Sequence, residues 1–415
     1  MVRSNFISIS VFLILIAETI PLKIFGLPSP FEFSQIFYLI SFFLLYNKNS
    51  FLSFLSSSIF RKLYSSYFLF LILQYIIGNY FKEEPGFNFP FFNAASSFII
   101  LYVFYQIHSW NQLIRCNNLL ILVLLFANLF GILIFIFGEP FASIRMTLAA
   151  YTEGWVFYGK GDPIAALSPT VFIYAYPVII LPILSLTSYS ITRNYRYLIL
   201  MFFSLIIVTL NSERISFGAT FLMLLILIYK LKIRVKLSTF FLGSLIFLVL
   251  FNFFSQDILS ESSGYNRSFS SNNDIENRFF KMGTAIYTVF KSPLTGGTNK
   301  EYINTTIREF GFKPSSAHNT YINIARNSGV FGFILFLIFL RFLYRIIIWI
   351  QKQSNFAEKR FFYGYIYSFF AILMVGFFHN GGVFTREPWT WILIGFLVSF
   401  TNFKKFSTFK KSQYN

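Results

Sequence analysis

The chain has 415 residues, of which 56% are hydrophobic and only 12% charged, and its formal net charge at pH 7 is +18. Several runs of about 18 residues carry hardly a charge, which is typical of transmembrane helices and excludes a soluble globule built around one core. Cys116 is the only cysteine, which excludes an internal disulfide, and the three histidines are far apart in the sequence. Neither a metal site nor a cofactor is therefore expected.

In chain order, the hydrophobic segments predict about twelve membrane-spanning helices and hence an all-α integral membrane protein. The first segment follows Arg3 and has no clear small-residue cleavage site, so we expect a retained helix rather than a removed signal peptide. The predicted spans are 6–22, 31–47, 63–79, 92–108, 118–138, 169–190, 197–211, 215–230, 237–255, 329–350, 361–379 and 388–403.

The basic residues between these segments predict the orientation of the chain. With the N-terminus placed in the cytoplasm, the inner segments carry nineteen Lys and Arg residues, whereas the outer segments other than 256–328 carry six. The positive-inside rule therefore favours cytoplasmic positions for both termini. The net charge is then mainly a topology signal and an attraction to anionic membrane lipid. Because the basic residues are scattered over short loops, no nucleic-acid partner is expected.

Two outer segments, 139–168 and 256–328, are longer than simple connections need to be. The second is rich in Ser, Asn, Gly and charged residues, and it contains helix-like pieces at 275–290 and 317–327. We therefore predict three domains. They are a transmembrane bundle of about nine helices at 1–255, an extracytoplasmic loop domain at 256–328, and C-terminal transmembrane helices with a short basic cytoplasmic tail at 329–415.

Two arginines and one histidine are predicted to lie on the outer face. Arg214 stands where the spans 197–211 and 215–230 meet, Arg278 opens a helix-like stretch of the long loop, and His318 closes that loop. Arginine presents a planar fork of donors that suits phosphate oxygens. Histidine changes protonation near neutral pH and can take the proton from an attacking hydroxyl. Together these residues predict a diphosphate-binding site with a general base.

Each of these residues also has a purely structural interpretation. Arg214 is placed to snorkel to lipid headgroups or to pair with Glu213, and Arg278 is placed to be a solvated loop charge. His318 is placed to cap a helix or to pack inside the protein. His379, at an outer helix end, is interpreted first as a packing residue and second as a lining residue of the same cavity.

Three local motifs carry a family resemblance, and they span roughly residues 211 to 333. They are Asn211–Gly218 around Arg214, Asn277-Arg278 followed by the turn Pro293–Gly297, and Ala317–Tyr321 followed by Gly329–Gly332. These motifs resemble those of the bacterial O-antigen ligase and O-antigen polymerase superfamily. One departure is that the family turn usually reads Gly-x-Gly, whereas this chain has Gly296-Gly297-Thr298. We interpret this turn as an element that shapes the site.

The resemblance implies a GT-C-like polytopic architecture and metal-independent glycosyl transfer on the outer face of the bacterial inner membrane. The donor would be an oligosaccharide on undecaprenyl diphosphate. Arg214 and Arg278 would engage the diphosphate, and His318 would activate the acceptor hydroxyl. Asn319 and Tyr321 would support the histidine. Membrane lipid and a chain-length regulator protein are further candidate partners.

Three functions remain open from the sequence. The preferred one is a polysaccharide repeat-unit polymerase for O-antigen, capsule or exopolysaccharide, whose acceptor is the terminal sugar of another lipid-linked repeat unit. The second is an O-antigen ligase, whose acceptor is the lipid A-core. The third is a flippase for lipid-linked oligosaccharide, which fits about twelve spans. The sequence shows no repeat between its halves, however, and transport does not explain the long outer loop.

Overall fold

The computed structural model of the chain consists of helices and short connections in the residues that it describes, with no strand among them. The described residues are 2–19, 33–82, 91–148, 159–168, 171–211, 214–233, 273–311, 319–377 and 388–413. The predicted span 237–255, His318 and His379 lie outside these ranges.

The helices of the first half are mostly short. They are α1 (Val2–Thr19), α2 (Phe33–Leu45), α3 (Lys48–Ser56), the π-helix η1 (Ile59–Tyr64), α4 (Ser65–Ile76), the π-helix η2 (Ile77–Phe81), α5 (Phe91–Tyr105), α6 (Trp110–Phe137) and α7 (Phe141–Leu148). η1, α4 and η2 follow one another without a break, so the predicted span 63–79 lies within one continuous helical rod.

The second half contains the longest helix of the described residues. Its helices are α8 (Val171–Val178), α9 (Ile180–Thr192), α10 (Tyr195–Leu210), α11 (Arg214–Lys230), α14 (Asn273–Lys291), α15 (Asn299–Phe310), α16 (Thr320–Gln353), α17 (Phe356–Gly376) and α18 (Pro388–Gln413). α16 is kinked at Gly329, whose φ of 62° and ψ of −165° are not helical. The predicted span 329–350 therefore begins at this kink, and a first leg, 320–328, precedes it.

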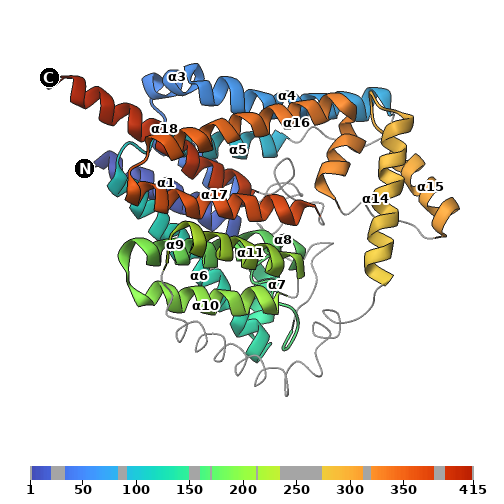
Figure 1. Ribbon diagram of the computed structural model, residues 1–415, viewed down its shortest axis with the longest axis horizontal. Helices are drawn as coiled ribbons and strands as arrows, with labels where there is room; N and C mark the ends of the chain where they lie inside the picture. Colours follow the sequence, from blue (N-terminus) through green and yellow to red (C-terminus); the bar gives the residue numbers. More distant parts are fainter. Residues whose placement is uncertain are drawn as a thin grey trace.

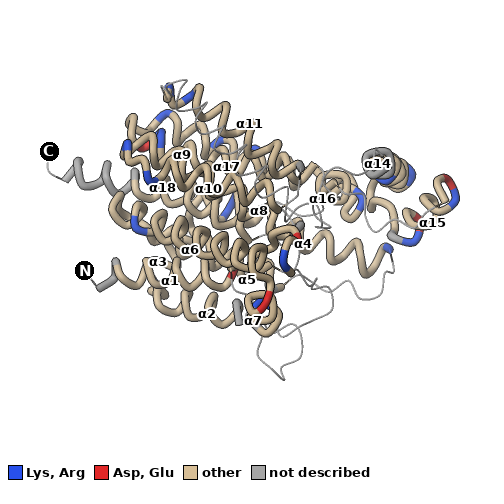
Figure 2. The backbone as a smooth tube through the Cα atoms, turned by 90° about the horizontal axis from the view of Figure 1, so that it is seen from below, with Lys and Arg blue, Asp and Glu red and all other residues tan. Residues whose placement is uncertain are grey.

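Most helices run side by side in one direction, and α14 crosses that direction (Figure 1). The start of α1 and the end of α18 lie at one end of the bundle, whereas α14 and α15 lie at the other end in both views (Figures 1 and 2). α16 connects the two ends, because it packs on α14 near its start and on η1 and α18 further along. The helices are thus arranged as a bundle, and α14 and α15 form a cross-lying unit at the end opposite the termini.

Three helices are long and apolar enough to cross a membrane, among the residues that the structure describes: Trp110–Phe137, Ile173–Thr192 and Thr320–Gln353. Six shorter apolar helices accompany them: Asn5–Thr19, Gln35–Leu45, Asn93–Tyr105, Tyr195–Leu210, Ile215–Lys230 and Pro388–Phe403. The all-helical, apolar character predicted from the sequence is confirmed. The number of twelve spans stays a prediction.

The core of the bundle is built from aromatic side chains with a few paired polar groups. Tyr365 of α17 stacks on Phe396 of α18, with ring centroids 4.2 Å apart. The Tyr365 hydroxyl donates to Asn117 Oδ1 of α6 at 2.6 Å, and all three residues are buried. A buried hydroxyl without an acceptor would lose its hydrogen bonds to water and gain none in return. The hydrogen bond to Asn117 avoids this cost and joins α17 to α6, while the ring contact joins α17 to α18.

Short polar side chains determine where several helices begin. Asn355 and Glu358 form a capping box at the start of α17, in which each side chain accepts from the backbone N–H of the other residue, at 2.9 and 2.8 Å. Ser109 accepts from the N–H of Gln112 at the start of α6. These bonds satisfy N–H groups that have no partner inside the helix.

Candidate functional site

The predicted site residues belong to α11, to α14 and to the parts of the chain that adjoin the start of α16 and the end of α17. The backbone of α11 begins at Arg214, and Arg278 is part of α14. His318 directly precedes Asn319, the N-cap of α16. His318 and His379 lie outside the described residues, and the structure describes the backbone but not the side chains of Arg214 and Arg278. Asn319 and Tyr321 are therefore the predicted site residues whose contacts are on view.

Asn319 fixes the start of α16 and ties it to α17. Its Oδ1 accepts from the N–H groups of Tyr321 and Ile322, both at 3.0 Å, which is the bonding pattern of an N-cap. Its Nδ2 donates to the carbonyl of Phe377 at 2.9 Å, and only 7% of the residue is exposed. Because His318 is the neighbour of Asn319 and His379 follows Phe377 by two residues, this bond joins the two segments that carry these histidines.

Tyr321 strengthens the same junction from within α16. Its hydroxyl donates to the carbonyl of Leu373 in α17. Its ring packs on Phe377, with centroids 4.5 Å apart, and on Phe336, with centroids 5.6 Å apart. The hydroxyl is thereby committed to the backbone, and Tyr321 holds the start of α16 against the end of α17.

The turn at Pro293–Gly297 interlocks with the first leg of α16. Gly296 has a φ of +73°, and a Cβ there would lie 2.1 Å from the carbonyl oxygen of Arg326. Gly329 has a φ of +62°, and a Cβ there would lie 2.0 Å from the carbonyl oxygen of Leu294. Between them, the N–H of Val330 donates to Pro293 O at 2.9 Å. Both glycines are required by backbone conformation and by close approach, so the two motifs form one rigid frame.

Lys82, at the end of η2, is bound into this frame from the other half of the chain. Its Nζ donates to the carbonyls of Gly297 at 2.9 Å, Arg326 at 2.7 Å and Asn327 at 3.2 Å. Two of these carbonyls close the first leg of α16, where a positive charge is favoured by the helix dipole. Nothing in the local sequence around Lys82 indicates contacts with residues so distant in the chain.

Arg326 joins the frame to α15. It is buried, and its guanidinium carbon lies 4.5 Å from the ring centre of Tyr302, within the range of a cation–π contact. Burial raises the pKa of Tyr302 to about 12, and the charge of Arg326 opposes that rise. Arg326 therefore connects the helix that follows His318 to the cross-lying unit.

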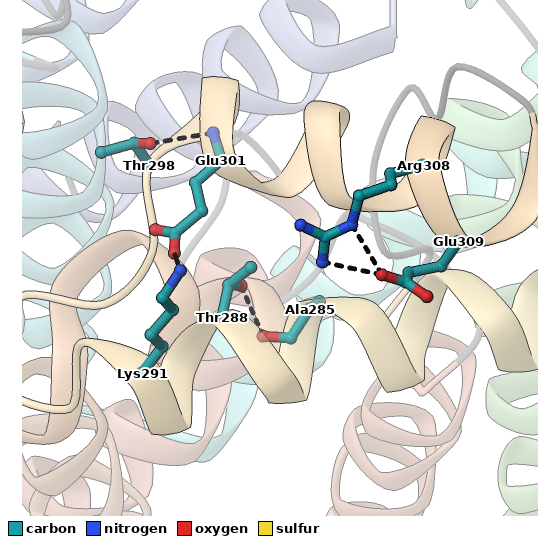
Figure 3. A network of polar contacts seen from close by, with 7 residues as sticks. All are labelled: Ala285, Thr288, Lys291, Thr298, Glu301, Arg308 and Glu309. Atoms are coloured by element: carbon teal, nitrogen blue, oxygen red, sulfur yellow. Dashed lines mark hydrogen bonds and ion pairs between the residues drawn. The ribbon is translucent and has the colours of Figure 1, made fainter.

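Polar contacts within α14 and α15 hold that unit together (Figure 3). Thr298 caps α15 by accepting from the N–H of Glu301 at 3.0 Å, and the Glu301 carboxylate pairs with Lys291 of α14 at 3.3 Å. Gly297 packs against Thr288, which fixes the turn between the two helices. The predicted helix-like piece 275–290 corresponds to α14, whereas α15 was not predicted.

An apolar cavity of about 380 Å³ lies between α14 and the start of α16. Ile286 and Phe290 of α14 face Tyr321, Ile322 and Phe333 of α16 across it. Phe290 is 79% exposed, so the cavity opens past an aromatic side chain to the surroundings. An open apolar cavity of this kind, beside the first residues of α16, is suited to a hydrocarbon chain rather than to a polar ligand.

A buried arginine that sequence reasoning did not single out, Arg145, helps to hold a segment that also contacts the end of α10. Arg145 of α7 is only 1% exposed, and its Nη2 donates to the carbonyl of Ser168 at 2.6 Å. The buried Asn211, three residues before Arg214, donates to Ile164 O at 2.6 Å. The segment 159–168 is thus held between α7 and the end of α10. Asp162 caps a turn in it by accepting from the N–H of Gly159 at 2.8 Å.

No group of three or more potential metal ligands occurs among the His, Cys, Asp and Glu side chains that the structure describes.

Comparison with known families matches residues 164–337 to the model described as O-antigen ligase. The matched range includes Arg214, Arg278 and His318, together with the interlocked glycine frame, and it excludes Lys82 and Arg145. No curated protein and no solved structure matches the chain.

Proposed function

We propose, on the premise that this chain belongs to the superfamily of O-antigen ligases and polymerases, that it is a polysaccharide repeat-unit polymerase of the bacterial inner membrane. It would transfer a glycan from undecaprenyl diphosphate to the terminal sugar of another lipid-linked repeat unit. Both termini would lie in the cytoplasm, and the α14 end of the bundle would lie on the extracytoplasmic side.

The apolar cavity between α14 and α16 is the observation that carries this proposal. Arg278 precedes Ile286 of the cavity wall by eight residues on α14, about 12 Å at the rise of an α-helix. His318 precedes Tyr321 of the opposite wall by three residues. A donor with a long apolar tail and an anionic head would thus find an apolar channel and a cation on the same pair of helices.

The proposed reaction needs one bond to form and one to break. The acceptor hydroxyl oxygen attacks the anomeric carbon of the donor glycan, the bond from that carbon to the diphosphate breaks, and undecaprenyl diphosphate leaves. His318 would take the proton of the attacking hydroxyl, a role for which its ordinary pKa near neutrality suits it. Arg214 and Arg278 would stabilise the negative charge that develops on the leaving diphosphate.

The interlocked frame around Gly296, Gly329 and Lys82 would keep His318 in place. General base catalysis depends on a hydrogen bond of about 2.6–3.2 Å to the reacting hydroxyl, so small displacements of the base are costly. Asn319 and Tyr321 would act as positioning residues, because their own polar groups bind the backbone of α16 and α17.

An O-antigen ligase is the second candidate, because the matching family model carries that description. A ligase would use the same donor and the same residue types, and it would differ in taking the lipid A-core as acceptor. Membership of the superfamily does not separate the two activities.

Deletion of the gene followed by analysis of lipopolysaccharide and capsule separates the two candidates. A polymerase predicts that single repeat units are still attached to the lipid A-core while long polymer is lost. If bare core is found instead, with polymer accumulating on undecaprenyl diphosphate, the polymerase proposal is wrong and the ligase is correct.

Complementation of the same deletion distinguishes an enzyme from a flippase. His318→Ala should be present in the membrane at normal abundance and restore little polymer, while repeat units continue to reach the outer face. A flippase would largely tolerate this change. Arg214→Lys tests the diphosphate interaction separately, since full activity with lysine would exclude a bidentate arginine contact.

A further inference from the structure

A second cavity lies at the other end of α16, far from the candidate site. It has a volume of about 290 Å³ and is formed where η1, α16 and α18 meet, with Ile59, Phe342, Trp349 and Thr401 among its lining residues. Arg345, also at its wall, follows the kink at Gly329 by sixteen residues, about 24 Å along the helix. The cavity therefore lies toward the Gln353 end of α16, well separated from Asn319 at the start of that helix.

Two exposed cations border this cavity. Lys62 of η1 and Arg345 of α16 are both exposed, and neither forms a hydrogen bond or ion pair through its side chain within the described part of the chain. The Lys62 ammonium lies 5.9 Å from the ring centre of Phe342, so it is held over an apolar floor. A pair of available positive charges beside an apolar surface is complementary to an amphipathic anion.

The local backbone presents Lys62 at this position. η1 is a π-helix, and its wider turn changes the direction in which its side chains point relative to an α-helix. The Ser65 hydroxyl donates to Phe60 O at 3.0 Å, which helps to satisfy the altered backbone at the end of this segment. π-turns within helices often occur at functional positions.

An aromatic side chain marks the depth of the cavity. Trp349 is half-buried, and its ring packs on Phe400 of α18 with centroids 5.5 Å apart. Tryptophan favours the interface between lipid headgroups and hydrocarbon, where one part of the ring is wet and the other apolar. The cations and Trp349 are therefore placed at headgroup level, whereas Phe342, three residues before Arg345 on α16, lies nearer the hydrocarbon.

We propose that this cavity binds one anionic phospholipid, with its phosphate between Lys62 and Arg345, its headgroup region beside Trp349 and an acyl chain against Phe342. Basic pockets between membrane helices commonly take acidic headgroups by this combination of charge and apolar contact. The bound lipid would connect η1, α16 and α18, and it would stabilise their packing. It is independent of the glycosyl transfer proposed above.

The test compares lipid binding to the full-length protein and to two double variants. Thermal unfolding is followed in detergent during titration with phosphatidylglycerol or with phosphatidylcholine, and retained lipid is counted by native mass spectrometry. Lys62→Gln/Arg345→Gln removes the two cavity cations. Arg196→Gln/Lys230→Gln removes two exposed cations from α10 and α11, neither of which lines the cavity, and it is the matched control.

We expect phosphatidylglycerol to raise the unfolding temperature of the wild type and the control, with one lipid retained. The Lys62→Gln/Arg345→Gln protein should bind it about thirtyfold more weakly, the loss expected for two interfacial cations. Equal binding by both double variants would overturn the proposal, and so would an equal effect of phosphatidylcholine. An equal shift with inorganic phosphate would show a free-anion site instead. If the double variant does not fold, each single variant should show about fivefold weaker binding.

Discussion

At the Thr320 end of α16, nearby cations are engaged by the protein itself, whereas at the Gln353 end two cations face an open cavity. Lys82 gives three hydrogen bonds to carbonyls and Arg326 lies buried over Tyr302, so both serve the frame around the candidate site. Lys62 and Arg345 are exposed at the other end. The difference shows that the contacts of a basic side chain, rather than its presence in the sequence, distinguish a residue that stabilises the fold from one that is available to bind a ligand.

The largest expected effect comes from the histidine at the Thr320 end. His318→Ala should lower the rate of glycosyl transfer by about 10²–10⁴-fold, the usual contribution of a general base. The measurement is transfer between purified lipid-linked repeat units. His108→Ala is the control, because it removes a histidine that lies away from the candidate site. His108 contacts Asn402 of α18 at 3.3 Å, next to Thr401 of the second cavity. Equal losses in both variants would mean that the effect is structural.

The glycine frame predicts the next largest effect, this time on stability. Gly329→Ala forces a residue with a Cβ into a φ of +62° and brings that atom 2.0 Å from Leu294 O. The backbone strain alone should lower the free energy of unfolding by about 1–3 kcal/mol. Gly283→Ala, on α14, is the matched control, since its Cβ would meet nothing within 4 Å. It should be neutral or stabilising by up to about 1 kcal/mol. If Gly329→Ala and Gly283→Ala have the same unfolding temperature, the close packing of Gly329 against Leu294 does not contribute to stability.

Sequence reasoning located the motifs better than the contacts between them. The helical pattern of 275–290 was sufficient to predict α14, observed at Asn273–Lys291, because its apolar residues repeat with helical spacing. α15 is short and polar, so hydropathy gave no signal for it. Asn319 could be expected at the loop end as a helix cap, yet its bond to Phe377 could not. Lys82 reaches residues more than 200 positions away, and such a pairing depends on the fold as a whole.

Lys82 provides a smaller and more selective test of the same end. Lys82→Met leaves three carbonyls without their shared donor, and hydrogen bonds to a charged group each contribute about 1.5–3 kcal/mol. Because water can reach a half-buried site, we expect the total loss of unfolding free energy to be near the value for one such bond. Lys300→Met removes an exposed lysine of α15 and should change stability by less than about 0.5 kcal/mol. If Lys82→Met and Lys300→Met unfold at the same temperature, Lys82 does not stabilise the frame.

Tyr302→Phe should have the smallest effect, and it separates the ring from the hydroxyl in the contact with Arg326. The hydroxyl is buried without a hydrogen-bond partner in the described structure, so its removal should be neutral or slightly stabilising at pH 7.

Because the pKa of Tyr302 is raised to about 12 in the folded protein, the unfolded state ionises first. The stability that this difference provides is complete below pH of about 10 and is lost as the pH rises toward 12. Between these two pH values, thermal unfolding of Tyr302→Phe should therefore show a smaller loss of stability than that of the wild type. Tyr302→Leu, which removes the aromatic ring, should be less stable than the wild type at both pH values. If the leucine variant matches the phenylalanine variant at pH 7, the ring contributes nothing to holding Arg326, and the link between α15 and the start of α16 must lie elsewhere.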